Sequence, residues 1–206
     1  MKFARHAVAA LVLAAATGPV FADAKTESFV EENANEVLEA LNDPTLSREE
    51  RTELFSGYME EFADFNAVSR FVIGRYANRF TPQELSRFQR AFRNYALAVY
   101  ENELDAYRGE QVVVDRSIDR TPNDSIVDTR IPRADGQEMN VRWRVLKRNG
   151  EYQVVDVALN VNGNLIWLAI EQQAQFLSLL DRTNGSADAL IRKIEQMTRE
   201  VRAGRR

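Results

Sequence analysis

The run TPQELSRFQRAFRNYALAVYENELDAYRGEQVVVDRSI, from Thr81 to Ile118, changes its hydrophobic period at Gly109. Before that glycine, apolar side chains recur at steps of three and four residues, which predicts a long amphipathic helix. Its start signal is strong, because Thr81 can cap the first turn, Pro82 fits the first helical position and Glu84 can complete a capping box. After the glycine, β-branched residues predict a strand. The chain is therefore expected to combine helices with a sheet.

Four β-branched runs of largely alternating hydrophobicity follow this change of period. They occupy residues 111–118, 125–131, 139–146 and 152–159. Asn149-Gly150 separates the last two runs, and Asn-Gly between such runs is a strong hairpin signal. The economical arrangement is a four-stranded antiparallel meander with one face covered by helices and the other in water.

Helical periodicity and capping signals predict further helices on both sides of the strands. They are expected at residues 25–41, 47–62, 64–73, 165–180 and around 190–194. Ser47 and Glu50 fit a capping box, Asp64 can cap the next helix and Gly74 can stop it. We therefore expect an α+β fold in which the N-terminal helices and two C-terminal helices pack on one face of a four-stranded antiparallel sheet. One domain spans residues 23–198, and the basic tail 199–206 is expected to be disordered.

The N-terminus has the pattern of a secretory signal. A basic start is followed by an apolar run at residues 7–16, which is too short to span a bilayer as a permanent helix. Small residues follow, and cleavage could come after Ala22 or after Ala24. Residues 1–22 are therefore expected to form a signal peptide, and the absence of cysteine suits export to a bacterial periplasm.

The missing residue types exclude several classes of function. The chain has no cysteine, and its single histidine is His6, inside the expected signal. Ser-His and Cys-His nucleophiles and histidine metal sites are thereby excluded from the mature chain. Without the signal, 31 acidic side chains face 25 basic ones, since Lys2 and Arg5 are removed. A net charge of −6 without a concentrated basic face does not favour nucleic-acid binding.

Large aromatic side chains are concentrated in the helical half. Of the 19 aromatic residues, 12 lie between Phe55 and Tyr107 and only four lie after Arg108. The segment FADFNAVSRFVIGRY, residues 62–76, contains four of them. Stripes of this kind at helical spacing are usually core packing, but they can also line a place where an apolar ligand is held. Residue types alone leave both interpretations open.

Acidic residues supply the material for an alternative, catalytic function. Clusters occur at Glu60-Glu61-Asp64 and Glu101-Glu103-Asp105, and paired carboxylates can hydrolyse glycosides or hold Ca²⁺. The competing interpretation is that these clusters form the solvated sides of two helices. Asp128 and Asp156 lie in predicted strands, where either could point inward.

Arginines alternate with apolar residues in Val141-Arg142-Trp143-Arg144-Val145. In a strand, this pattern places the valines and Trp143 on one face and the two arginines on the other. Arg142 and Arg144 could receive anionic head groups or an acidic partner, or could simply solvate the open face of the sheet.

The order and spacing of several motifs resemble the MlaC (toluene-tolerance) family. Its pattern is approximately D-F-x-x-I, L-G-x-Y/W, T-x-x-Q, F-x-x-x-F and W-x-V-x-D-V. The corresponding segments here are Asp64–Val68, Ile73–Tyr76, Thr81–Glu84, Phe88–Phe92 and Tyr152–Val157. Two departures stand out: Tyr152 replaces the family tryptophan, and residues 160–164, Asn-Val-Asn-Gly-Asn, replace an E-G-x-S segment.

This resemblance implies a periplasmic carrier rather than an enzyme, with no cofactor and no metal. Its cargo would be a phospholipid, held in a hydrophobic pocket between helices and sheet. Members of the family work with an inner-membrane ABC transporter that has an MCE-domain subunit and with an outer-membrane lipoprotein and porin complex. They shuttle phospholipid between the outer and inner membranes and maintain outer-membrane lipid asymmetry. Some relatives are associated with hopanoids instead.

Apolar side chains that face inward in the predicted elements are the candidates for lining this pocket. They are Val68, Phe71, Val72, Phe88, Phe92 and Tyr95 from the helices, and Trp143, Val157 and Leu159 from the sheet. The competing functions are a carboxylate-based hydrolase on a similar α+β scaffold and an adaptor that has a solid core and binds only protein.

Overall fold

A computed structural model describes the chain except residues 1–23, 105–110, 133–135, 137, 162 and 205–206. The expected signal peptide therefore lies outside the described residues. The helices are α1 (Ala24–Asn42), α2 (Arg48–Phe62), α3 (Phe65–Ile73), the 3₁₀ helix η1 (Gly74–Asn78), α4 (Pro82–Leu104), α5 (Leu168–Arg182) and α6 (Ala187–Ala203). The strands are β1 (Val113–Thr121), β2 (Asp124–Pro132), β3 (Glu138–Arg148), β4 (Glu151–Val161) and β5 (Asn164–Trp167). The described part contains no helix with the length and apolarity needed to cross a membrane.

The α+β class is confirmed, but the predicted number of strands is wrong. The described residues form one antiparallel sheet of five strands in the order β1-β2-β3-β4-β5. The fifth strand, β5, occupies the start of a segment that was predicted to be helical from Leu165. It pairs with the end of β4, where Leu159 lies opposite Ile166. Gly163 adopts φ 85°, a conformation that lets the chain turn back between the two strands.

The local start signals predicted from the sequence are confirmed. At α2, the Ser47 backbone N–H donates to Glu50 Oε2 at 2.8 Å, and the Glu50 N–H donates to Ser47 Oγ at 3.2 Å. Asp64 accepts a hydrogen bond from the Ala67 N–H at 2.8 Å and so caps α3. Each bond satisfies a backbone N–H that a helix start otherwise leaves free. These contacts fix where the helices begin.

The predicted Asn149-Gly150 hairpin is also confirmed. Asn149 has φ 53° and Gly150 has φ 90°, so both central residues are in the left-handed region. A two-residue turn of this kind matches the twist of the flanking strands and therefore sets the register of β3 against β4.

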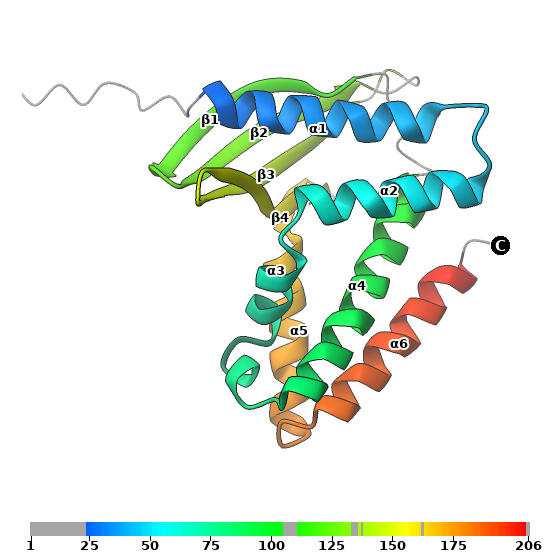
Figure 1. Ribbon diagram of the computed structural model, residues 1–206, viewed down its shortest axis with the longest axis vertical. Helices are drawn as coiled ribbons and strands as arrows, with labels where there is room; N and C mark the ends of the chain where they lie inside the picture. Colours follow the sequence, from blue (N-terminus) through cyan, green and yellow to red (C-terminus); the bar gives the residue numbers. More distant parts are fainter. Residues whose placement is uncertain (1–23, 105–110, 133–135, 137, 162, 205–206) are drawn as a thin grey trace, which may run out of the picture.

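The helices do not all pack on the sheet, which corrects the predicted layering. In Figure 1, α1 lies along the sheet, whereas α3, α4, α5 and α6 form a bundle that extends away from it. The bundle has its own core, and none of the described strand residues belongs to it. The buried members include Val72, Ile73, Phe88, Phe92, Phe176, Leu180, Leu190 and Ile194. A helical bundle can bury its apolar stripes on one another, so it needs no sheet as a partner.

The sheet builds separate apolar clusters with α1. Leu38 of α1 is buried with Val112, Ile131, Val141 and Val157, and Val30 is buried with Val127 and Val145. The strand residues among them share the face of the sheet that α1 covers, and Val112 directly precedes β1. The opposite face of β2 and β3 carries alternating charged residues, as the strand period requires.

The last helix is longer than expected. Helix α6 continues through Arg199 to Ala203, so most of the segment that was predicted to be a disordered tail is helical. Its buried face includes Leu190, Ile194 and Thr198. This face packs against α4, and the packing stabilises the final turns of the helix. Intrinsic helix propensity alone would leave these turns frayed.

Candidate functional site

Five of the nine predicted pocket residues lie in or beside the core of the helical bundle. Val72 and Phe88 are fully buried, Phe92 is buried, and Val68 and Tyr95 are partly buried against them. Phe71 does not share this environment, because its side chain is 41% exposed. The adjacent positions Phe71 and Val72 therefore point to different surfaces.

The other three predicted residues lie on the covered face of the sheet. Trp143 and Val157 are direct neighbours across β3 and β4, and Leu159 pairs with Val141 two positions further along. All three belong to the cluster that contains Leu38 of α1. The structure thus divides eight of the nine residues between two separate clusters and leaves Phe71 exposed. Their role in lining a lipid pocket stays a prediction.

Not every apolar side chain near the sheet is fully buried. Leu159 and Leu168 are only partly buried against the sheet cluster. On α5, Gln172 comes one turn before Phe176, and its Nε2 is buried without a hydrogen-bond partner among the described residues. Burial raises the pKa of Tyr95, which packs against the bundle core from α4. The described residues thus include partly buried apolar side chains and a buried polar atom without a partner.

A groove of about 970 Å³ lies between α1 and α2. Its lining residues come from α1, from the α1–α2 connection, from α2 and from the residues that precede β1. They are Asn35, Glu36, Glu39, Ala40, Asn42, Asp43, Leu46, Leu54, Tyr58 and Gln111. None of the nine predicted pocket residues lines this groove. Its lining mixes carboxylates and amides with apolar side chains, of which Leu54 is 41% exposed.

Asn35 of the groove contacts a residue of the sheet cluster. Its Oδ1 accepts a hydrogen bond from the Val112 N–H at 2.7 Å, and its Nδ2 donates to the Val112 carbonyl at 3.4 Å. The Val112 side chain is buried in the cluster that contains Trp143 and Leu159. These bonds fix α1 against the segment that precedes β1.

Two groove carboxylates have defined partners. Glu36 forms a hydrogen bond with the Tyr58 hydroxyl, and the pKa of Tyr58 is raised, first by burial and then by the negative charge of Glu36. Asp43 accepts hydrogen bonds from the Thr45 hydroxyl at 2.7 Å and from the Thr45 N–H at 2.8 Å. These bonds lower the pKa of Asp43, so its carboxylate is charged at neutral pH.

The groove was not predicted from the sequence, because the candidate pocket residues were chosen among large apolar side chains. A signal was nevertheless present in the charge pattern of the first two helices. Residues 24–62 contain eleven acidic and three basic side chains, a net charge of −8. Such a segregation of charge points to an electrostatic role for this part of the surface.

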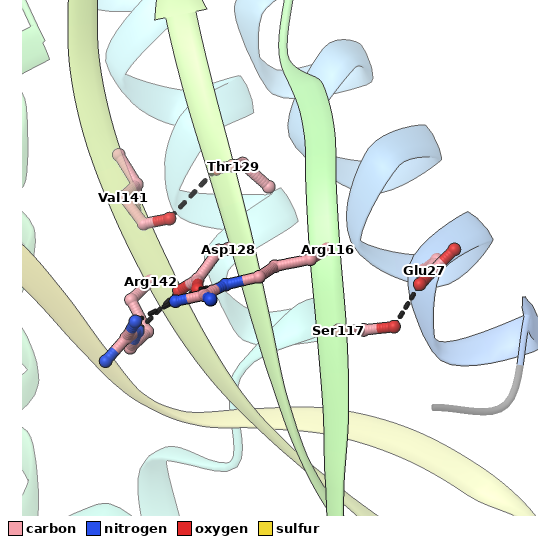
Figure 2. A network of polar contacts seen from close by, with 7 residues as sticks. All are labelled: Glu27, Arg116, Ser117, Asp128, Thr129, Val141 and Arg142. Carbon is pink, nitrogen blue, oxygen red and sulfur yellow. Dashed lines mark hydrogen bonds and ion pairs between the residues drawn. The ribbon is translucent and has the colours of Figure 1, made fainter. Parts of the chain in front are cut away.

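The open face of the sheet carries a network of arginine–carboxylate pairs (Figure 2). Asp128 lies between two guanidinium groups: Arg116 Nε donates to it at 2.7 Å and Arg142 Nη2 at 2.9 Å. Burial alone would raise the pKa of Asp128, but the hydrogen bonds from Arg142 and Arg116 outweigh it and hold the pKa below its ordinary value. Arg144 likewise makes a two-pronged contact with Asp124, at 3.0 and 3.1 Å. Both predicted outward arginines are therefore engaged within the sheet.

Asp156 lies on the same face of the sheet but is covered by the start of α5. Its Oδ1 accepts hydrogen bonds from the Val157 N–H at 2.8 Å and the Ala169 N–H at 2.9 Å. Desolvation raises the pKa of Asp156 despite these bonds and the nearby Arg144. The carboxylate of Asp156 thus links β4 to α5. This structural contact accounts for a buried acidic residue in the strand, and no catalytic role is needed to explain it.

The first acidic cluster predicted from the sequence is used for structural contacts. Glu60 forms an ion pair with Arg93, and Asp64 both caps α3 and pairs with Arg148 at 2.5 Å. The side chains of the second cluster, residues 101–105, lie outside the described residues. Within the described residues, no group of three or more potential ligands could hold a metal ion.

Both the sequence and the fold of this chain match known proteins. The family model described as MlaC protein matches residues 31–196. A solved structure, described as a phospholipid-binding protein from Ralstonia solanacearum in complex with a phospholipid, is 19% identical and superposes with a TM-score of 0.70. The match covers 88% of this chain and 99% of that chain. None of the curated proteins matches the chain. Because the family model spans most of its length, the chain belongs to the MlaC family.

Proposed function

We propose that this protein is a periplasmic carrier that binds a phospholipid and shuttles it between the outer and inner membranes. Its partners would be an inner-membrane ABC transporter with an MCE-domain subunit and an outer-membrane lipoprotein and porin complex. Through them it would maintain outer-membrane lipid asymmetry. Membership of the MlaC family supports this proposal, as does a shared fold with a protein that binds a phospholipid.

The observation that carries the proposal is the incompletely sealed apolar surface of the sheet layer. It includes the cluster around Val112, whose backbone N–H donates to Asn35 of the groove. In this cluster, Trp143, Leu159 and Leu168 are only partly buried. Unsealed apolar side chains near a polar surface suit an amphipathic ligand, whose acyl chains would lie along this face of the sheet.

The energetics of carrying a lipid explain why such a surface is needed. Each CH₂ group removed from water contributes about 0.8 kcal/mol, so a diacyl lipid with about thirty such groups needs on the order of 20 kcal/mol of shelter. A carrier must supply this shelter without catalytic groups. Release would then require a partner that reshapes the pocket, because spontaneous dissociation from such a site is slow.

Lipid extraction and vesicle uptake test the proposal directly. The mature chain is purified without detergent, its ligands are extracted for mass spectrometry, and the empty protein is then incubated with phospholipid vesicles. We expect co-purified phospholipid and uptake near one lipid per folded protein. Absence of both would contradict the carrier function and favour an adaptor with a solid core. Extraction of a hopanoid would instead support the carrier function and identify a different cargo.

A matched pair of variants separates specific loading from general surface stickiness. Leu159→Asp places a charge on the partly buried sheet surface and should abolish uptake. Ile170→Asp changes an apolar side chain that is 50% exposed on α5 and should leave uptake unchanged. Circular dichroism and urea unfolding show whether each variant is folded. Equal uptake by folded Leu159→Asp and the wild type would place the acyl chains elsewhere.

A further inference from the structure

Strand β1 carries two exposed arginines on either side of an exposed isoleucine. Arg116, Ile118 and Arg120 all lie on the open face of the sheet, beside the open-face residues of β2. Ile118 is 49% exposed, and the side chains of Arg116 and Arg120 are 64% and 52% exposed. Among the described strands, β1 pairs with β2 alone, so the backbone groups of its outer side have no strand partner there. The proposed carrier function assigns no role to this surface.

The two arginines are held in place by recessed carboxylates, one of which is drawn in Figure 2. Arg116 Nε donates to Asp128 Oδ2 at 2.7 Å, and Arg120 Nη1 lies 3.3 Å from Asp124 Oδ2. The Asp128 and Asp124 side chains are only 19% and 13% exposed, and each also pairs with an arginine of β3. Two guanidinium groups therefore share each carboxylate, and the excess positive charge lies on the solvent side.

The arginines of β1 keep hydrogen-bond donors for a partner. In the described part of the chain, Arg116 pairs through Nε and Arg120 through Nη1. A guanidinium has further N–H donors in a planar fork that matches a carboxylate, so donors remain at both positions. Because the recessed carboxylates already restrict the two side chains, a partner that binds them loses less side-chain entropy than it would at free arginines.

Acidic side chains near β1 are directed to other contacts. Asp115 pairs with an arginine of β2 at 2.8 Å. Asp119 accepts a hydrogen bond from Ser125, which is buried on the covered face of the sheet. Glu27 of α1 contacts Ser117 of β1, on the side that α1 covers (Figure 2). The open face of β1 therefore keeps the positive charge of its two arginines.

We infer that β1 is a docking surface for an extended acidic segment of a partner protein, which adds to the edge of the sheet as a further strand. In this mode of recognition, main-chain hydrogen bonds supply affinity and alternate side chains supply specificity. An acidic, an apolar and an acidic residue at alternate positions of the partner would face Arg116, Ile118 and Arg120. The inference goes beyond the proposed carrier function, because it depends neither on the lipid nor on its pocket.

The same side chains disfavour two other occupants. In an antiparallel pair of two β1 strands centred on Ile118, Arg116 of each copy would face Arg120 of the other, and like charges directly opposite one another are destabilising. The arginines would attract an anionic membrane, but Ile118 offers little apolar area for insertion compared with the apolar face of a membrane-binding helix. An acidic protein segment satisfies both the charges and the backbone groups of the edge.

Titration with matched peptides tests the inference. The probes are the blocked peptide TETVTET, its neutral counterpart TQTVTQT and its basic counterpart TKTVTKT, and nuclear magnetic resonance of the isotope-labelled mature protein measures affinity and locates the shifted amides. We expect the shifts to concentrate at residues 116–120. TETVTET should bind about fourfold more tightly than TQTVTQT, since each exposed charge contact changes an equilibrium by a factor of about 2. TKTVTKT should bind most weakly.

Two double variants with equal charge changes locate the contact. Arg116→Gln with Arg120→Gln should abolish the preference for TETVTET over TQTVTQT, while the β2 carboxylates keep their β3 arginines. Arg192→Gln with Arg199→Gln, at two exposed positions of α6, should keep the preference. Circular dichroism shows whether each variant is folded, and phospholipid uptake from vesicles should be unchanged in both.

Peptides methylated on the backbone distinguish strand addition from contact through side chains alone. An added antiparallel strand uses the N–H groups of alternate residues, which all lie along one of its edges. One version of TETVTET is N-methylated at the odd positions and another at the even positions. One version should lose binding and the other should keep it, and equal affinity of the two would overturn strand addition.

The remaining outcomes separate this inference from the carrier function. Absence of shifts in β1, or equal affinity for the three peptides, would overturn the docking surface and leave the carrier intact. If phosphatidylglycerol vesicles perturb the β1 amides and the peptides do not, the surface binds an anionic membrane and the inference is wrong. Failure of the wild type to take up phospholipid would contradict the carrier function alone, because peptide binding does not depend on lipid.

Discussion

The helical bundle and the sheet layer solve the problem of burying apolar surface in different ways. In the bundle, Phe88 and Phe92 stack at 5.9 Å, and Phe176 meets both rings edge-on at 6.2 and 6.0 Å. The sheet layer relies on valines under α1, and several of its apolar residues remain partly exposed. The bundle core is thus more completely buried, whereas a larger share of the apolar residues in the sheet layer can accept further contacts.

This difference suggests a division of labour within one domain. Interlocking aromatic rings fix relative positions, because offset and edge-on ring pairs have defined geometry. Aliphatic side chains on a sheet constrain the position and orientation of a neighbouring group less tightly. The bundle can therefore hold the protein together while the sheet layer exchanges its contacts, and mutations in the two regions should have different consequences.

The largest expected effect is on stability, from Phe88→Ala in the bundle. Phe88 is fully buried, so removing its ring should lower the free energy of unfolding by about 3–5 kcal/mol. Urea unfolding of the lipid-free protein measures the change. Phe71→Ala is the matched control, because that ring is 41% exposed and its loss should have a much smaller effect. Similar losses for the two variants would contradict the idea of a more completely buried bundle core.

Leu159→Ala in the sheet layer should separate stability from loading. Leu159 is only partly buried, so we expect a loss of about 1–2 kcal/mol in the free energy of unfolding, below the range for a fully buried leucine. Phospholipid uptake per folded protein should fall by a larger factor than for any bundle variant that still folds. Unchanged uptake would remove Leu159 from the proposed acyl-chain surface.

Asp128→Ala tests the charged face of the sheet. Loss of the carboxylate leaves Arg116 and Arg142 without their shared acceptor and should cost about 1–2 kcal/mol at neutral pH. The pKa of Asp128 is lowered in the folded protein, so its stabilising contribution is present above the ordinary carboxyl pKa and is lost as the pH falls through the folded-state value. Unfolding curves of the two proteins should therefore converge in acid. A difference that persists at low pH would contradict this account.

Asp156→Asn should give the smallest change, with the opposite pH dependence. Burial raises the pKa of Asp156, so the protonated form is favoured in the fold, and this contribution is lost as the pH rises through the folded-state value. Asparagine keeps an acceptor for the Ala169 N–H and carries no charge to desolvate. The variant should therefore gain stability relative to the wild type as the pH rises from acid to neutral. A constant difference across that range would argue against a raised pKa.

The features predictable from the sequence were those governed by short-range contacts. The Ser47–Glu50 capping box and the Asn149-Gly150 turn are satisfied within a few residues, so their chemistry is visible in the sequence. Strand β5 shows the limit of this reasoning. A strand of four residues is shorter than a recognisable period, and its apolar residues run directly into those of α5. The turn glycine Gly163 was the available signal for a fifth strand.

The candidate site was less predictable, because it depends on which elements meet in space. Phe88 and Phe92 have the same apolar spacing whether they face a ligand or one another, and the structure shows that they pack on one another. The groove combines Asn35 and Tyr58 from separate helices with Gln111 from the segment before β1. No period along the chain connects residues brought together in this way. Only the charge segregation of residues 24–62 pointed to that region.

The position of β1 at the edge of the sheet has a consequence for the solubility of the protein. Among the described strands it pairs with β2 alone, so its other side presents backbone groups that could template pairing with a second chain. Asp115, Arg116 and Arg120 are exposed along it, and charges at an edge discourage such association. The proposed carrier would pass repeatedly through an empty state with apolar surface uncovered. In that state, the charged edge strand would protect against aggregation at the moment when the risk is greatest.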